Sequence, residues 1–220
     1  MDIKLRLEQP EDYREVEEVA REAFWNFYAP GCDEHYLLHI MRSSPNFVKG
    51  LDFVAVADRK IVGIVVFLKS FILTDDGCKY EVLSMGPIAV LPQYQRMGIG
   101  RMLIAHTRKI AAEMGYRAIL LCGEPRYYSK VGFEAAEHFN IRTSEDKYFA
   151  ALHVCPLYPD ALAGVSGRYY EDVIYNTDSD KAKEFDKLFP RKERIEGTSS
   201  QKRFEEVLAM QKNYKSSSDK

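Results

Sequence analysis

The sequence predicts an α/β protein, because apolar patterns typical of helices and of strands alternate along most of the chain. Strand-like runs dominate residues 52–90, and segments with helical spacing lie before and after them. Beyond Pro156 the apolar stripes become narrow and charged residues dominate. We therefore expect one domain over residues 1–158 and a helical C-terminal extension over residues 159–220, with amphipathic helices and a disordered tail.

The N-terminal segment predicts one strand and two helices. Ile3–Leu7 alternates apolar and charged residues with a period of two, which predicts a strand. Pro10 is suited to the first position of a helix, acidic residues follow it, and apolar residues continue at helical spacing to Phe24. Pro30-Gly31 ends this helix, and a second one is predicted from about Asp33 to Arg42.

The middle of the chain predicts three strands. Asp52–Ala57 and Ile61–Lys69 flank the polar turn Asp58–Lys60, which predicts an antiparallel hairpin. Asp75–Gly77 forms a second turn and leads into a strand at Tyr80–Val90.

The next predicted helix is Met97–Met114, which Gly115 terminates. Its buried face is predicted to consist of Ile99, Met102, Leu103, Ile110 and Met114. Ala118–Cys122 is fully apolar, as expected of a central strand, so Cys122 is assigned to the core. A short helix at Tyr127–Val131 and a late strand at Tyr148–Val154 complete the domain.

The extension predicts two charged helices, Asp180–Phe189 and Lys202–Lys212. Their apolar faces are narrow, so we expect them to pack on the domain or on a second copy of the chain in a homodimer. Lys215–Lys220 is the segment predicted to be disordered.

Composition excludes several classes of protein. The 220 residues contain 31 Lys and Arg against 33 Asp and Glu, so no nucleic-acid partner is expected. The longest apolar-rich stretch, Ile61–Leu73, is interrupted by Gly63 and Lys69 and is too short to span a membrane. Four scattered cysteines and a charged N-terminal sequence favour a cytoplasmic protein with free thiols.

The segment after Val90 carries the strongest chemical signal. A strand ends there, a polar loop follows, and Gly98 and Gly100 open a helix. Unpaired amides and the helix dipole favour an anion at such a turn, and Arg96 and Arg101 add positive charge. This pattern predicts a phosphate or pyrophosphate site, although a tight turn with glycines for packing fits it equally well. A dinucleotide-binding motif needs glycine at position 103, where Leu stands, and a P-loop needs G-K-[ST], which does not follow here. The sequence therefore matches neither motif.

Two motifs resemble the GNAT superfamily of N-acetyltransferases. Gln95–Gly100 matches its Q/R-x-x-G-x-G/A motif, and Tyr128–Phe133 resembles its Y-x-x-x-G-F element. The stretch Gly123–Phe133 resembles in particular the bacterial subgroup of predicted N-acetyltransferases typified by YhbS. The resemblance implies a mixed, mostly antiparallel sheet, with a central parallel pair splayed at the cofactor cleft and helices on both faces.

The resemblance also implies acetyl-CoA as co-substrate, with no metal. Backbone groups of Ile88, Ala89 and Val90 would pair with the pantetheine arm. The residues expected around the pyrophosphate are Gln95, Arg96, Met97, Gly98, Ile99, Gly100, Arg101 and Met102.

Tyr128 would protonate the departing CoA thiolate, and the alternative is that it only packs beside Phe133. The family's usual glutamate position on the signature strand is Ser84 here, so the identity of a general base is open. Glu81 is one candidate, although its odd offset from Ser84 places it on the opposite face of a regular strand. Glu124 is the other candidate. A strong base is not obligatory, because alignment of the amine with the thioester can supply much of the rate of acetyl transfer.

We therefore expect direct acetyl transfer to a primary amine on a small molecule or a protein, with neither nucleic acid nor membrane as partner. One alternative is a catalytically degenerate domain that senses acyl-CoA or mediates an interaction, and another is an enzyme for longer acyl groups. His35 and His39 lie four residues apart and could bind a metal, but a solvent-facing pair is the preferred interpretation. The aromatic run Phe24–Tyr28 fits either a docked helix end or an acceptor wall.

Overall fold

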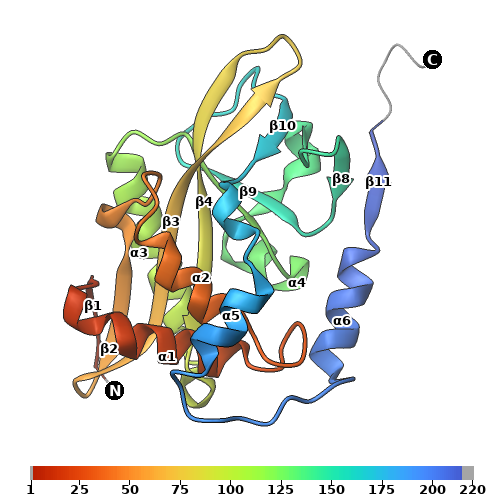
Figure 1. Ribbon diagram of the computed structural model, residues 1–220. Helices are drawn as coiled ribbons and strands as arrows, with labels where there is room; N and C mark the ends of the chain where they lie inside the picture. Colours follow the sequence, from red (N-terminus) through yellow and green to blue (C-terminus); the bar gives the residue numbers. More distant parts are fainter. Residues whose placement is uncertain (1, 215–220) are drawn as a thin grey trace. The chain divides into compact units, whose positions relative to one another are not determined.

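The computed structural model describes residues 2–214 (Figure 1). These residues fall into two compact units. Unit 1 comprises the chain up to Leu68 together with Met85–Ile110 and Asp172–Phe204. Unit 2 comprises Lys69–Ser84, Ala111–Glu171 and the residues from Glu205 onward. Strands β3 and β4 contribute residues to both units, and each unit is described below by itself.

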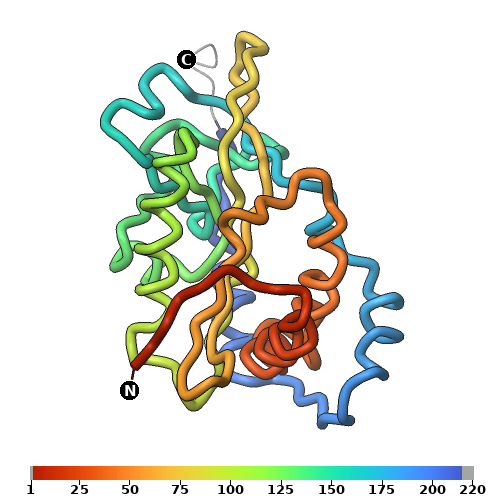
Figure 2. Tube along the Cα trace, turned by 90° about the vertical axis from the view of Figure 1, so that its left-hand side faces the viewer, coloured from red at the N-terminus to blue at the C-terminus, as the bar shows by residue number. Residues whose placement is uncertain are grey.

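Unit 1 contains a small antiparallel sheet with helices on both faces. β1 pairs with β2, and β2 pairs with the first half of β3, both antiparallel. Figure 2 shows α1 and α3 on opposite sides of these strands. The elements that lie in this unit, wholly or largely, are β1 (Ile3–Leu7), α1 (Tyr13–Phe24), α2 (Glu34–Met41), β2 (Phe53–Ala57), the first half of β3 (Lys60–Thr74), the second half of β4 (Lys79–Val90), α3 (Ile99–Glu113), α5 (Ser179–Asp186) and α6 (Ser199–Leu208).

Unit 2 contains the parallel pair. Leu83 and Ser84 of β4 lie opposite Ile119 and Leu120 of β5 in parallel register. β5 pairs antiparallel with β9, and β9 with β6. The further elements of this unit are β5 (Ala118–Cys122), α4 (Pro125–Tyr128), β6 (Glu134–Ala135), β7 (Ile141–Arg142), β8 (Lys147–Phe149), β9 (Leu152–Pro156), β10 (Gly167–Tyr170) and β11 (Gln211–Asn213).

Burial explains why the central strands have such apolar sequences. Every residue from Ile61 to Leu68 of β3 is buried, as expected of a strand covered on both faces. In unit 2 a separate core gathers around β5 and β9, and it includes Leu120, Val154 and Tyr169. Tyr169 reaches this core from β10, which pairs antiparallel with β3 and parallel with β7.

The structure confirms the predicted fold class, a mostly antiparallel sheet with a parallel pair, and corrects several details. Met102 and Met114 were assigned to the buried face of α3, but they are 41% and 47% exposed. Leu103 is buried as predicted, and Ile104, which was not assigned to this face, is buried as well, because both lie on the side of the helix that faces the strands. Cys122, assigned to the core, is exposed as the last residue of β5.

The C-terminal part of the chain contains strands that the sequence analysis missed. The late strand predicted at Tyr148–Val154 is two strands, β8 and β9, separated by a turn. The helix predicted at Lys202–Lys212 ends at Leu208, and Gln211–Asn213 pairs with β8 as β11. β10 lies inside the segment that was predicted to be helical, and the predicted disordered tail falls outside the described residues. The domain boundary at residue 158 stays a prediction. No helix within residues 2–214 has the length and apolar content needed to cross a membrane.

Gly167→Ala should destabilise the pairing of β10 with β3. A Cβ atom at Gly167 would lie 2.2 Å from the carbonyl oxygen of Leu73 and 2.7 Å from Cα of Thr74, its register partner. The two backbones would have to separate, so we expect a loss of about 1–3 kcal/mol in the free energy of unfolding, measured by urea titration. The control Ser166→Ala should change it by less than about 0.5 kcal/mol. Equal stability of the two variants would contradict the close approach.

Candidate functional site

The predicted anion-binding turn connects β4 to α3 in unit 1. β4 ends at Val90, a short 3-10 turn follows, and α3 begins at Ile99. The start of the turn is tied to β3, because the Leu91 amide donates to the Val62 carbonyl oxygen at 2.9 Å. The Gln95 side chain holds the turn from within, since its Nε2 donates to the Val90 carbonyl oxygen at 3.0 Å.

The first turn of α3 lies directly on the strands. A Cβ atom at Gly63 of β3 would lie 3.1 Å from Cγ2 of Ile99 and 3.2 Å from the carbonyl oxygen of Ala89. The absence of a side chain at Gly63 therefore permits the approach of the helix start to both β3 and β4. Ile99 and Leu103 are buried by this contact.

The backbone of the turn is suited to bind an anion. The first helical hydrogen bond in α3 runs from the Met102 amide to the Gly98 carbonyl oxygen at 3.0 Å, so the amides at the helix start have no partner within the helix. Arg96 and Gly98 have φ angles of 63° and 87°, and such alternation turns successive amides toward one side as an anion-binding concavity. A Cβ atom at Gly98 would meet nothing within 4 Å, so an approaching ligand finds open space there.

The remaining predicted binding residues line the same segment of unit 1. Met97 and Met102 are exposed, as are Arg96 and Arg101, so two positive side chains lie in solvent beside the start of α3. On β4, Ala89 is buried whereas Ile88 and Val90 are half-buried. The structure therefore gathers the predicted cofactor-binding residues in one unit.

Tyr128 is the last residue of α4 in unit 2. Its half-buried ring contacts the rings of Phe133 and His153, each with a centroid distance of 5.7 Å. Gly123 makes room for it, because a Cβ atom there would lie 2.2 Å from Cε2 of Tyr128. The position of the ring is thus fixed by packing on several sides.

The two glutamates predicted as bases are both occupied with other contacts. Glu81 is 57% exposed, and its carboxylate lies 3.5 Å from the Lys69 ammonium. Glu124 caps α4, where its carboxylate accepts a hydrogen bond from the Arg126 amide at 3.2 Å. Both lie in unit 2 with Tyr128, whereas the anion-binding turn lies in unit 1.

Ser84 has a role that the sequence did not predict. It is buried, and its hydroxyl is hydrogen-bonded to the phenol of Tyr169. Tyr169 belongs to β10, in the segment assigned to the helical extension, so the sequence analysis missed it. The available signal was the pair of aromatic residues at Tyr169 and Tyr170, because aromatic residues favour strands.

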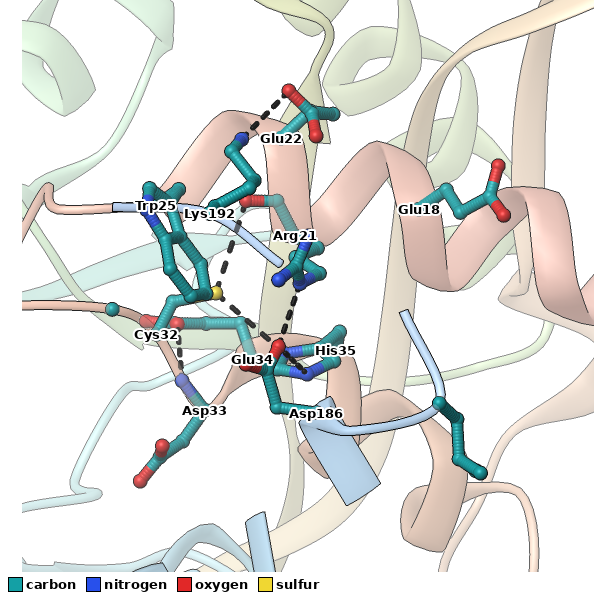
Figure 3. A network of polar contacts seen from close by, with 12 residues as sticks. Glu18, Arg21, Glu22, Trp25, Cys32, Asp33, Glu34, His35, Asp186 and Lys192 are labelled. Atoms are coloured by element: carbon teal, nitrogen blue, oxygen red, sulfur yellow. Dashed lines mark hydrogen bonds and ion pairs between the residues drawn. The ribbon is translucent and has the colours of Figure 1, made fainter. Parts of the chain in front are cut away.

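The histidine pair on α2 does not face solvent as predicted, because His35 is completely buried. Figure 3 shows the reason: Asp186 of α5 lies 3.2 Å from Nε2 of His35 and 2.6 Å from Nε of Arg21. Nδ1 of His35 lies 3.6 Å from Sγ of Cys32. His39 is 54% exposed, as predicted. Residues 2–214 contain no group of three side chains able to hold a metal.

The aromatic run after α1 contacts the C-terminal segment of unit 1. Nε1 of Trp25 donates to the Glu193 carbonyl oxygen at 2.7 Å, and the Tyr28 ring lies 4.6 Å from that of Phe204. These contacts agree with a docked helix end, and the acceptor wall stays a prediction. The segment from α5 to α6 is thereby attached to α1 and α2 at several points.

Sequence comparison places this arrangement in a known family. The family described as "Acetyltransferase (GNAT) domain" matches residues 50–135, which include β4, the anion-binding turn, α3 and Tyr128. The "Uncharacterized N-acetyltransferase YhbS" of Escherichia coli K12 is 31% identical over 170 residues, which cover 76% of this chain and 96% of that protein. The chain belongs to the GNAT family and is an N-acetyltransferase of that type.

Solved structures agree with this assignment. The crystal structure of YhbS from Escherichia coli in complex with CoA matches with a TM-score of 0.70 and 28% identity, over 80% of this chain and 92% of that one. A GNAT family acetyltransferase from Brucella melitensis in complex with acetyl-CoA has the same fold, with a TM-score of 0.62 and 24% identity over 79% of this chain and 98% of that one.

The buried His35 should make stability depend on pH. Burial lowers the pKa of His35 to about 4, and this effect outweighs the attraction of Asp186. The unfolded chain, with an ordinary histidine pKa near 6.5, takes up the proton first, so stability that is complete above about pH 6.5 is lost as the pH falls toward 4. We expect this contribution to be on the order of 2–3 kcal/mol, measured by urea unfolding across that window.

The variant His35→Gln should lose that part of the pH dependence, whatever its absolute stability. The control His138→Gln removes a histidine that is 66% exposed, and it should keep the slope of the unmodified protein. The same slope in all three proteins would show that the pKa of His35 does not differ between the folded and unfolded states.

Proposed function

We propose that the protein transfers the acetyl group of acetyl-CoA directly to a primary amine. The observation that carries this proposal is the turn between β4 and α3, where unpaired amides and two arginines form a surface for a pyrophosphate. A relative at 28% identity was crystallised with CoA, which supports the same ligand here.

The residues of the turn fit the cofactor in chemistry and in shape. Open space above Gly98 leaves room for a phosphate against the backbone, and Arg96 and Arg101 offset its negative charge. Backbone groups of Ile88, Ala89 and Val90 bind the pantetheine arm as an added strand would. Amides from Arg96 to Met102 hold the pyrophosphate, while Gln95 keeps the turn in place through its bond to Val90.

Acetyl-CoA supplies the activated acyl group as a thioester. The phenol of Tyr128 donates a proton to the departing thiolate, and the packing that fixes its ring keeps the hydroxyl in one position. We assign no nucleophilic role to Cys122: although the residue is exposed, desolvation by nearby protein atoms and the charge of Glu171 raise the pKa of its thiol to about 12. Acetyl-CoA turnover against a panel of amines, read as thiol release, tests the activity, and a trapped acetyl group on Cys122 would overturn direct transfer.

Gly100→Val should abolish CoA binding, because a branched side chain at the helix start blocks the backbone that binds the pyrophosphate. We expect the dissociation constant for CoA, measured by isothermal titration calorimetry, to rise at least about 100-fold. The control Ala105→Val changes an exposed residue of the same helix and should leave the affinity within about twofold. Retained affinity in Gly100→Val would mean that the pyrophosphate binds elsewhere.

Tyr128→Phe should lower kcat much more than it weakens acetyl-CoA binding, because only the proton donor is lost. We expect kcat to fall by about 10²-fold with a nearly unchanged dissociation constant for acetyl-CoA. Tyr127→Phe is the matched control, since its ring is 41% exposed on the same helix. Equal losses of turnover and binding in Tyr128→Phe would reduce Tyr128 to a packing role.

A further inference from the structure

Acetyl transfer needs a proton acceptor, because an aliphatic ammonium has a pKa of about 10.4 and cannot attack a thioester until it is deprotonated. Glu81 is paired with Lys69, and Glu124 caps α4. Ser84 carries no carboxylate, and its hydroxyl is already bonded to Tyr169. The inference below rests on the proposed function and concerns the residue that accepts this proton.

The strand registers define one face of the sheet in unit 2. Ser84 lies opposite Leu120 in the parallel pair, so their side chains share a face, and Cys122 follows two residues later on the same face. The bond between Ser84 and Tyr169 places the Tyr169 side chain over that face as well. Leu120 and Tyr169 are buried in the core, whereas Cys122 is exposed. Beyond Leu120, therefore, this face opens to solvent.

Glu171 lies at this open end. It is the residue directly after β10 and stands two positions beyond Tyr169, which is the spacing for one face of an extended chain. Desolvation is the main cause of the raised pKa of the Tyr169 phenol and of the Cys122 thiol, and the charge of Glu171 raises both further. Glu171 is exposed, and within residues 2–214 no group forms a hydrogen bond or an ion pair with its carboxylate.

We propose that Glu171 is the general base that deprotonates the acceptor amine. The substrate ammonium gives one proton to the carboxylate, which later releases it to water. The neutral nitrogen then attacks the thioester carbonyl carbon, so that the N–C bond forms and the C–S bond breaks. The thiolate takes a proton from the phenol of Tyr128, and the second proton of the nitrogen restores that phenol.

The surroundings of Glu171 suit this task. Surrounding protein atoms raise its pKa above the usual glutamate value by desolvation, although solvent reaches the residue. A base whose pKa lies closer to the working pH accepts a proton from an ammonium with a smaller free-energy cost. The titratable groups that its charge reaches are the buried Tyr169 on β10 and the exposed Cys122 on β5. Their raised pKa values keep both protonated at neutral pH.

The test is the pH profile of Glu171→Gln with acetyl-CoA and whichever amine of the panel the unmodified protein acetylates. We expect kcat to fall about 10²-fold or more and the acidic limb of the kcat/KM profile to disappear, with the affinity for CoA unchanged. Glu145→Gln, an exposed position in the same unit, is the control and should behave as the unmodified protein does.

A second measurement tests the placement of Glu171 without any acceptor. Removing its charge should speed the modification of Cys122 by a thiol reagent at least about twofold, followed for that residue by peptide mass spectrometry. An unchanged rate would show that the carboxylate does not face Cys122 and would overturn the proposal.

The kinetic outcomes separate this inference from the proposed function. Loss of the acidic limb in Glu81→Gln or Glu124→Gln, with Glu171→Gln unaffected, would refute the role of Glu171 and leave acetyl transfer intact. No turnover by the unmodified protein on any amine, despite tight CoA binding, would refute acetyl transfer and the role of Glu171 together.

Discussion

The close approach of α3 to β3 at Gly63 is the contact on which the anion-binding turn depends. Any side chain at Gly63 would push against Ile99 and against the backbone of β4, and the amides at the helix start would move with the helix. The other end of the turn is held by the bond from Leu91 to β3. With both ends fixed, the backbone can keep the uncommon positive φ angle of Arg96, which on its own costs about 1 kcal/mol.

A second constraint holds the C-terminal segment of unit 1 in place. The Arg21 side chain is only 3% exposed, so its charge needs a partner, and Asp186 of α5 provides it. The same carboxylate faces His35, which burial keeps neutral, so one acidic residue serves two helices. α5 is attached to α1 and α2 by this polar group and by one aromatic side chain, because the Phe185 ring lies 5.6 Å from that of His35 and 4.5 Å from that of His39.

The sequence predicted those parts of the fold and site that depend on neighbouring residues. The hairpin around Asp58–Lys60 and the turn that ends at Gly98 each have a local pattern, and the structure contains both. β10 could not be predicted in this way, because its four residues become a strand only by pairing with distant residues of β3. The burial of His35 likewise depends on Asp186, far away in the sequence.

The same difference between local and distant determinants explains why the proposed cofactor-binding turn was easier to predict than a general base. Backbone amides bind a pyrophosphate, so the turn requires only glycines and a helix start, which remain visible in a single sequence. A proton acceptor is a side chain, and any strand end at the right edge of the sheet can supply it. In this chain Ser84 stands where the family usually has a glutamate, and its hydroxyl is bonded to Tyr169 of β10. The proposed base, Glu171, directly follows β10 and belongs to a segment without a local motif. The search for a base in such a protein therefore has to follow the strand registers rather than the motif.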